Sequence, residues 1–183
     1  MQNLSLSTVG IDEVGYGCWA GPLFICAAKF KTFPDFELND SKKLNETKRK
    51  ELYSKLIKIT NYNIGIASIS QINENGLAKA YKIALQKAIE PFKNKEFAMD
   101  GKTRKDINAS FYIKGDSKIS IIAAASIIAK VERDNLMERL HQEFPEYFFN
   151  KNKGYGTKKH IEALKKHGFC KEHRTCYNLS KYL

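Results

Sequence analysis

The segment Ile119–Glu143 constrains the fold more than any other part of the sequence. Its pattern predicts one long helix, which is apolar over almost all of its first half and charged over its second half. A helix that is apolar on every side must be covered by other elements, so we expect its N-terminal half to lie inside the protein. The apolar stretches Trp19–Phe30 and Ile119–Ala129 are both interrupted, and neither approaches the roughly 18 uninterrupted apolar residues of a membrane span.

Strands and helices are predicted to mix irregularly along the rest of the chain. Ser5–Ile11 and the apolar segment Pro22–Phe30 have the composition of strands. The first third is rich in strands and no strict strand–helix–strand repeat follows, which predicts an α/β protein with a layered mixed sheet, a hairpin meander and then crossovers. Further strands are expected at Tyr62–Ser68, Phe97–Asp100 and Ser110–Lys114, and helices after the N-cap Asn45, over Gly76–Phe92, and from the N-cap Thr157 to His167 with Gly168 at its end.

The chain length favours a single domain. The 183 residues, 43% of them hydrophobic, suffice for a sizeable core, and no internal repeat or Pro/Gly/Ser-rich linker divides them. We therefore expect one domain over residues 1–183, with about 145–183 as a small helical C-terminal appendage.

The N-terminal residues and the cysteines carry no export signal. Met1–Val9 contains neither a basic residue nor an apolar run, so no signal peptide is expected. The four cysteines show no C-x-x-C spacing, which argues against a zinc or thioredoxin-like site. These features predict a reduced, soluble, cytoplasmic chain with no membrane partner, and we expect it to be a monomer.

The charge balance points to an acidic partner. Lys and Arg number 31 against 20 Asp and Glu, which gives a formal net charge of +11. Aromatic residues between Tyr147 and Tyr155 interleave one basic cluster, and an aromatic face can stack on a base or a sugar. Nucleic acid is therefore the first candidate, although a lysine-rich surface that serves only solubility stays open. The basic clusters are Lys42–Lys43, Lys48–Lys50, Lys102–Lys105, Lys151–Lys159 and Lys165–Lys171.

Four carboxylates lie close to glycines at the ends of predicted strands: Asp12, Glu13, Asp100 and Asp116. Strand ends converge on one edge of a sheet, where ligands usually bind, so these four side chains can meet. Gathered like charges are unfavourable without cations, and oxygen ligands without histidine or cysteine favour Mg²⁺ or Mn²⁺. The cluster therefore predicts a divalent-metal site. The alternative is that Asp12 caps a turn and Asp116 caps the following helix.

Asp12 and Glu13 pose a geometric problem. Adjacent strand residues point to opposite faces, so the two cannot both face one metal ion in a regular strand. Either the strand twists into the glycine turn, or Glu13 serves a second metal position or the substrate from the edge. Asp134, in the middle of the long predicted helix, fits a supporting or ion-pairing role better than coordination.

The segment Gly10–Gly17 (GIDEVGYG), followed by Ala20-Gly21-Pro22, resembles the opening signature of the ribonuclease HII family. Five further blocks resemble the family's sequence in the family's order, so the resemblance spans almost the whole chain and is highly specific. These blocks are Leu38–Leu44, Met99–Gly101, Lys114–Ser117, Ala123–Asp134 and Lys153–Thr157.

The resemblance implies a ribonuclease H-like fold, in which helices flank a mixed sheet and a small helical part follows. It also implies an endonuclease that hydrolyses the RNA strand of RNA–DNA hybrids and cuts 5′ of single ribonucleotides embedded in duplex DNA, leaving 5′-phosphate and 3′-hydroxyl ends. The family's catalytic carboxylates correspond to Asp12, Glu13, Asp100 and Asp116, which would hold two metal ions. The alternatives are a basic nucleic-acid-binding module without catalysis and another two-metal nuclease of the same superfold, such as a junction resolvase.

The resemblance further implies residues that read the substrate. The family's Gly-Arg-Gly turn corresponds to Gly15-Tyr16-Gly17, whose peptide groups would read the ribose 2′-hydroxyl, and its junction-sensing tyrosine corresponds to Tyr155. Tyr16 stands where the family has arginine. A phosphate contact made by that arginine would be lost, whereas the two glycines keep the turn.

Phosphate contacts are expected just before a predicted helix, at Ser41, Lys42 and Lys43, with an ordinary solvated lysine pair as the alternative. The four histidines are expected on the surface or in packing. His173-Arg174 resembles a C-terminal motif of the family and is a weaker candidate for a phosphate contact.

Overall fold

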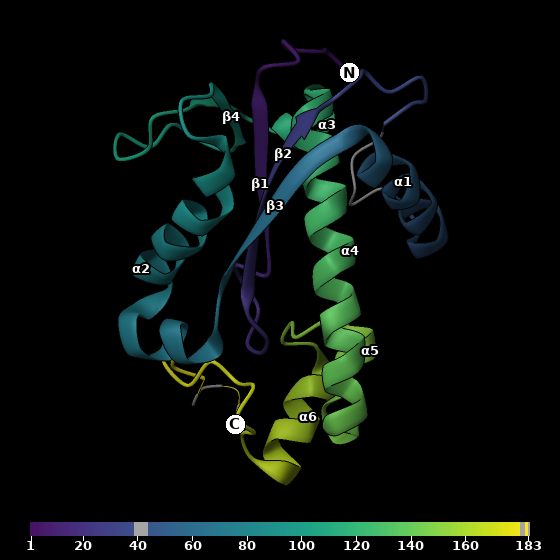
Figure 1. Ribbon diagram of the computed structural model, residues 1–183. Coiled ribbons are helices and arrows are strands. Elements are labelled where there is room, and N and C mark those ends of the chain that lie inside the picture. The colour runs from purple at the N-terminus through teal and green to yellow at the C-terminus, as the bar shows by residue number, and fades with distance from the viewer. Residues whose placement is uncertain (39–43, 180–181, 183) are drawn as a thin grey trace.

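The computed structural model describes residues 1–38, 44–179 and 182. At its centre lies a five-stranded sheet with the order β3-β2-β1-β4-β5 (Figure 1). The first three strands pair antiparallel as a meander, and β4 and β5 extend the sheet parallel to β1. The predicted mixed α/β sheet is thus confirmed. The strands are β1 (Val9–Val14), β2 (Leu23–Phe30), β3 (Thr60–Ala67), β4 (Phe97–Asp100) and β5 (Ser110–Tyr112).

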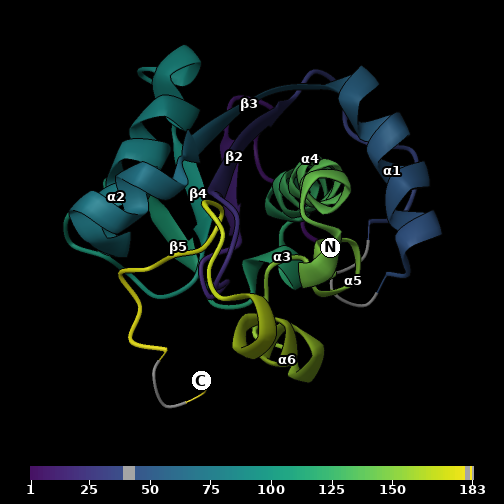
Figure 2. The ribbon, with the colours of Figure 1, turned by 90° about the horizontal axis from the view of Figure 1, so that it is seen from below.

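Helices cover both faces of this sheet (Figure 2). α4 (Ser120–Glu143) packs along β1 and β2 with α1 (Glu46–Ile59) beside it, and α2 (Ile69–Ile89) covers the opposite face. Each layer buries its own hydrophobic cluster, one between the sheet and α1/α4 and one between the sheet and α2. This two-sided burial explains why β2 is apolar along nearly its whole length.

α4 approaches β1 closely because Gly10 has no side chain. A Cβ atom at this position would lie 2.4 Å from the carbonyl oxygen of Ile121 and 2.8 Å from the amide nitrogen of Ile122. Every residue of α4 from Ser120 to Ala129 is buried, which confirms the predicted burial of its first half. In the described part of the chain, no helix has the length and apolarity to cross a membrane.

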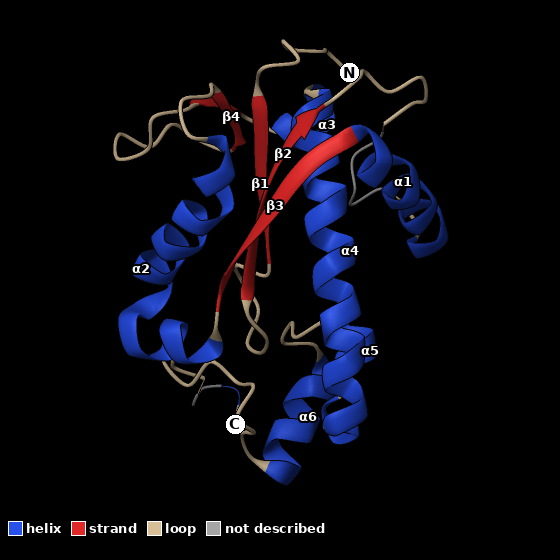
Figure 3. Ribbon diagram, viewed as in Figure 1, coloured by secondary structure: helices blue, strands red, loops and turns tan. Residues whose placement is uncertain are grey.

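The residues after α4 pack against its second half. They form short helices and loops, with no further strand in the described part (Figure 3). Met137 and Leu140 of α4 form a third hydrophobic cluster with Phe149, Leu164 and, from the loop after β1, Ala20. The boundary of an appendage near residue 145 stays a prediction. The elements are η2 (Pro145–Tyr147), α5 (Phe149–Asn152) and α6 (Lys158–His167); η1 (Glu90–Phe92) and α3 (Gly115–Lys118) lie earlier in the chain.

The largest differences from the predicted boundaries are at β1 and α2. β1 begins later and continues further, so Asp12 and Glu13 lie within the strand rather than after it. α2 begins seven residues before the predicted start at Gly76, because Ser68 and Gln71 form a capping box. Gly76, with φ of 74° and ψ of 160°, is not helical, so a kink at this residue divides α2 into two helical parts, and the predicted helix from Gly76 corresponds to the second part.

Replacement of Gly10 by alanine is expected to lower the free energy of unfolding by about 1–3 kcal/mol, because the added methyl group overlaps the backbone of α4. Gly17→Ala is the matched control, since a Cβ atom there meets nothing within 4 Å. Chemical denaturation of both variants measures the difference. Equal stability of Gly10→Ala and wild type would contradict the close packing of α4 on β1.

Candidate active site

Asp12 and Asp100 lie side by side on neighbouring strands. The parallel ladder of β1 and β4 pairs Ile11 with Met99, so the two aspartates occupy the next position of that ladder. Both project toward α4, because the residues two positions before them pack on that side of the sheet. The side chain of Ser126 in α4 hydrogen-bonds to Asp12, which is only 5% exposed.

Glu13 points to the opposite face, as the alternation along a strand predicts. Its Oε2 accepts a hydrogen bond of 3.4 Å from the hydroxyl of Tyr81 in α2. Burial, together with the charge of Glu13, raises the pKa of Tyr81, so that phenol stays protonated. Glu13 therefore lies on the α2 side of the sheet. Near the end of β1 it nevertheless lines the same cavity as Asp12.

Asp116 lies next to the main-chain partner of Asp100. The amide of Gly115 donates a hydrogen bond of 2.6 Å to Asp100 Oδ1, and this glycine is the first residue of α3. Asp116 follows it, is 3% exposed, and does not line the cavity. The structure thus brings Asp12, Glu13 and Asp100 to one cavity and places Asp116 one residue from the group that holds Asp100.

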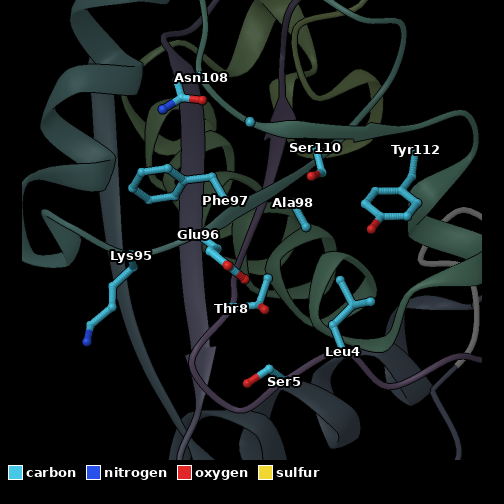
Figure 4. A pocket seen from close by; sticks show the side chains of 11 residues that line it. Leu4, Ser5, Thr8, Lys95, Glu96, Phe97, Ala98, Asn108, Ser110 and Tyr112 are labelled. Carbon is cyan, nitrogen blue, oxygen red and sulfur yellow. The ribbon is translucent and has the colours of Figure 1, made fainter.

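This cavity has a volume of about 250 Å³ and is bordered by the three carboxylates, the turn at residues 15–17 and Tyr155. Two cationic side chains, Arg49 and Lys130, also line it. Lys130 forms an ion pair of 2.8 Å with Asp134, so that aspartate contacts a residue that lines the cavity. A larger cavity of about 510 Å³ lies at the opposite ends of β1 and β4 and contains none of the predicted site residues (Figure 4).

Burial and like charge together disfavour the ionised form of Asp12. Its pKa is raised from 3.8 to about 8, first by burial and then by the charges of Glu13 and Asp100. Hydrogen bonds from Ser126 and from the Glu13 amide, the latter 2.9 Å long, act in the other direction without cancelling the rise. Without a cation, Asp12 is therefore protonated at neutral pH.

Two buried arginines pack against the turn after β1, and one of them, Arg174, binds its main chain. Gly15 has a φ of 89°, and a Cβ atom there would lie 2.3 Å from Nε of Arg133. Arg174 donates to the carbonyl oxygens of Gly15 and Tyr16 at 2.6 and 2.9 Å. The Tyr16 side chain is 45% exposed and contacts Tyr81 edge-to-face.

The proposed phosphate contact of Arg174 is wrong, because this side chain is fully buried. Its guanidinium group binds main-chain carbonyls that lie more than 150 positions earlier in the chain. Spacing along the sequence carries no signal for such a contact.

Tyr155 is 43% exposed at the mouth of the cavity, and its main chain is anchored by a histidine pair. The Tyr155 carbonyl can only accept, so His160 donates to it from Nδ1 (2.9 Å) and accepts from Nε2 of His173 (3.0 Å). His173 Nδ1 in turn accepts from the Cys170 amide. Burial lowers the pKa of both histidines, that of His173 to about 4, so both are neutral packing residues.

Sequence reasoning missed several residues that line or support the cavity. The one available signal was Ser126, a hydroxyl group within the otherwise apolar first half of α4. Arg49 belongs to a basic cluster recognised in the sequence, but nothing in its spacing pointed to the carboxylates. The predicted phosphate contacts Ser41, Lys42 and Lys43 lie outside the described residues.

Comparisons with known proteins agree with this architecture. The family model of ribonuclease HII matches residues 9–181. Ribonuclease HII of Ehrlichia chaffeensis is 41% identical over 184 residues, covering 97% of this chain and 88% of its own. That of Campylobacter jejuni subsp. doylei is 43% identical over 181 residues, covering 98% and 94%. A chain in the structure of the PCNA:RNase HII complex from Archaeoglobus fulgidus matches with a TM-score of 0.78 and 26% identity, over 94% of this chain and 95% of that one.

A mixed sheet whose central strand carries carboxylates beneath a long buried helix defines a nuclease of the ribonuclease H-like class. Within this class, the chain belongs to the ribonuclease HII family. It is a metal-dependent endoribonuclease that cleaves the RNA strand of RNA–DNA hybrids.

The raised pKa of Asp12 predicts a pH-dependent effect of Asp12→Asn on stability without metal. Asp12 binds its proton more tightly when folded (pKa about 8) than when unfolded (3.8), so its contribution is complete below about pH 4 and is lost as the pH rises toward 8. Asparagine has no such loss. The free energy of unfolding of Asp12→Asn, relative to that of wild type, should therefore increase between about pH 5 and about pH 8, by up to a few kcal/mol.

Urea denaturation in EDTA at several pH values measures this difference. Asp35→Asn, at an exposed position, is the control and should leave the pH profile unchanged. A difference between Asp12→Asn and wild type that is constant with pH would show that Asp12 does not carry the proton.

Proposed function

We propose that the cavity binds two divalent cations, Mg²⁺ or Mn²⁺, through Asp12, Glu13, Asp100 and Asp116. We further propose that the protein cuts 5′ of single ribonucleotides embedded in duplex DNA, as well as within longer hybrids, and leaves 5′-phosphate and 3′-hydroxyl ends. The observation that carries this proposal is the meeting of three carboxylates at one cavity, where burial and like charge leave Asp12 protonated. A divalent cation would relieve that repulsion.

The donor set fits Mg²⁺ or Mn²⁺. The four groups are carboxylates, which are hard oxygen ligands, and no histidine or cysteine of the described chain lines the cavity. As they stand, no three acidic, histidine or cysteine side chains of the described residues are close enough to hold an ion. We therefore expect cation binding to draw the carboxylates together as it displaces the proton of Asp12.

Paired divalent cations held by these carboxylates would supply an activated water molecule and charge neutralisation at the scissile phosphate and the leaving oxygen. Asp12, which feels the charges of both Glu13 and Asp100, is the expected shared ligand. Lys130 and Arg49 add positive charge to the cavity wall, where they would attract the phosphate backbone of the substrate. No side chain is required as a nucleophile.

The exposed turn and Tyr155 supply the proposed recognition of a ribonucleotide–DNA junction. Gly15, Tyr16 and Gly17 border the cavity, where the peptide groups of the turn can reach a ribose 2′-hydroxyl. Tyr155 is exposed beside them and can pack on the adjoining deoxyribose, which an added hydroxyl would displace. Tyr16 contributes no cation, so its affinity for phosphate is expected to be lower than that of the family's arginine.

Family membership decides against a non-catalytic binding module and against a junction resolvase. A cytoplasmic location, a monomeric state and phosphate contacts by Ser41, Lys42 and Lys43 remain part of the proposal. Size-exclusion chromatography with light scattering tests the monomer.

Replacement of Asp116 by asparagine is expected to lower cleavage at an embedded ribonucleotide by at least about 100-fold, because a metal ligand's charge contributes several kcal/mol to the transition state. Binding of the duplex should stay largely intact. The assay uses a duplex with one ribonucleotide and either Mg²⁺ or Mn²⁺, and cleavage should vanish in EDTA.

Asp106→Asn provides the control for Asp116→Asn, since Asp106 is an acidic residue paired with Lys82 away from the cavity. Normal cleavage by Asp116→Asn would remove Asp116 from the metal site. Equal cleavage of an all-DNA duplex by the wild type would reject the proposed specificity.

Tyr155→Ala should reduce cleavage at the ribonucleotide–DNA junction by at least about tenfold while changing the affinity for duplex much less, because a stacking ring is worth roughly 1–3 kcal/mol. Tyr155→Phe keeps the ring and should retain most activity. Single-turnover rates and fluorescence anisotropy measure the two quantities. Equal losses of rate and affinity in Tyr155→Ala would contradict a role in junction recognition.

A further inference from the structure

Arg174 uses its whole guanidinium group to hold the loop between β1 and β2. It lies in the C-terminal segment, which passes beside this loop (Figures 1 and 2). Nε and Nη2 donate to the carbonyl of Gly21 at 3.0 and 2.9 Å, and Nη2 also donates to that of Gly15. Nη1 donates to the carbonyl of Tyr16 and to the hydroxyl of Tyr177, the latter at 3.1 Å. All five N–H donors are thus used, and none of these acceptors is a carboxylate.

This contact determines which way the peptide groups of the turn face. The peptide bonds are trans, so the N–H of each group points away from its carbonyl. Because the carbonyls of Gly15 and Tyr16 point to Arg174, the amides of Tyr16 and Gly17 point away from it. Neither amide donates a hydrogen bond to any described residue, and both residues line the cavity.

Two adjacent outward amides above a buried cation form a concave site for an electronegative oxygen. The charge of Arg174 has no carboxylate among its hydrogen-bond partners, so its field adds to the main-chain dipoles of the turn. In this chain the central side chain of the turn is a tyrosine and supplies no charge of its own. Arg174 therefore adds positive potential to the turn from its buried side.

We infer that Arg174 is a positioning residue for ribose recognition. It keeps the carbonyls of Gly15 and Tyr16 on the buried side, so that the amides of Tyr16 and Gly17 present donors to the 2′-hydroxyl oxygen of the substrate. The inference rests on the proposed function, in which this turn reads the ribose.

A second buried arginine offers a matched control. Arg133 is also fully buried and also binds main-chain carbonyls, but those of Ala20, Pro22 and Lys153. It packs beside Gly15 without a hydrogen bond to the carbonyls of the turn. Its loss should loosen neighbouring loops and leave the direction of the two amides unchanged.

The test compares binding of two duplexes in EDTA, one with a single ribonucleotide and one all-DNA, by fluorescence anisotropy. Wild type should prefer the ribonucleotide duplex by at least about fivefold, as expected for one or two hydrogen bonds. Arg174→Met should bring the preference close to one and change the affinity for all-DNA duplex by less than about twofold. This ratio does not depend on the folded fraction, so a purely structural role would not move it.

The outcomes separate the inference from the proposed function. A wild type without preference refutes ribose reading by the turn altogether. A wild-type preference that Arg174→Met retains, or that Arg133→Met loses equally, overturns the inference alone.

If Arg174→Met does not fold, the preference of Tyr177→Phe for the ribonucleotide duplex tests the inference. The hydroxyl of this half-buried residue accepts a hydrogen bond from Arg174 and donates one of 3.2 Å to the Tyr16 carbonyl. A preference reduced about twofold supports the inference, and an unchanged preference overturns it.

Discussion

The packing of α4 against β1 is the contact on which the site depends. The missing side chain of Gly10 lets the backbone of the helix lie directly on the strand. This close approach carries Ser126 to Asp12, and one turn further it brings Lys130 to the cavity. The same helix then reaches the loop after β1 with Arg133. One rigid element therefore supplies a hydrogen bond to the central carboxylate, a cation to the cavity wall and an anchor for the neighbouring loop.

The charges of the site lower the stability of the metal-free protein. Asp12 is buried beside two further carboxylates, and burial together with their charges raises its pKa. Two cationic side chains, Lys130 and Arg49, line the cavity, and Lys130 is paired with Asp134. The rest of the fold offsets the repulsion through its two hydrophobic layers, and such a cluster fits the divalent cations proposed for it.

Local patterns predicted most of the fold and part of the site. The strands, the buried half of α4 and the opposite directions of Asp12 and Glu13 follow from hydrophobic periodicity and from strand geometry, which are properties of neighbouring residues. The early start of α2 was missed because its capping box follows directly on a strand and a glycine interrupts its pattern. The contacts of Arg174 could not be predicted from the sequence, because they depend on tertiary packing rather than on spacing along the chain.

The same long-range contact links substrate reading to the order of protein synthesis. Residues 15–17 leave the ribosome early, whereas their anchor follows some 160 positions later. During translation, β1 and its carboxylates exist long before the turn beside them is held in place. A nascent chain that stops short of residue 174 would carry exposed basic segments able to attract nucleic acid, but no organised reader for the sugar. If the turn reads the ribose as proposed, discrimination between RNA and DNA is among the last properties that this polypeptide acquires as it is made.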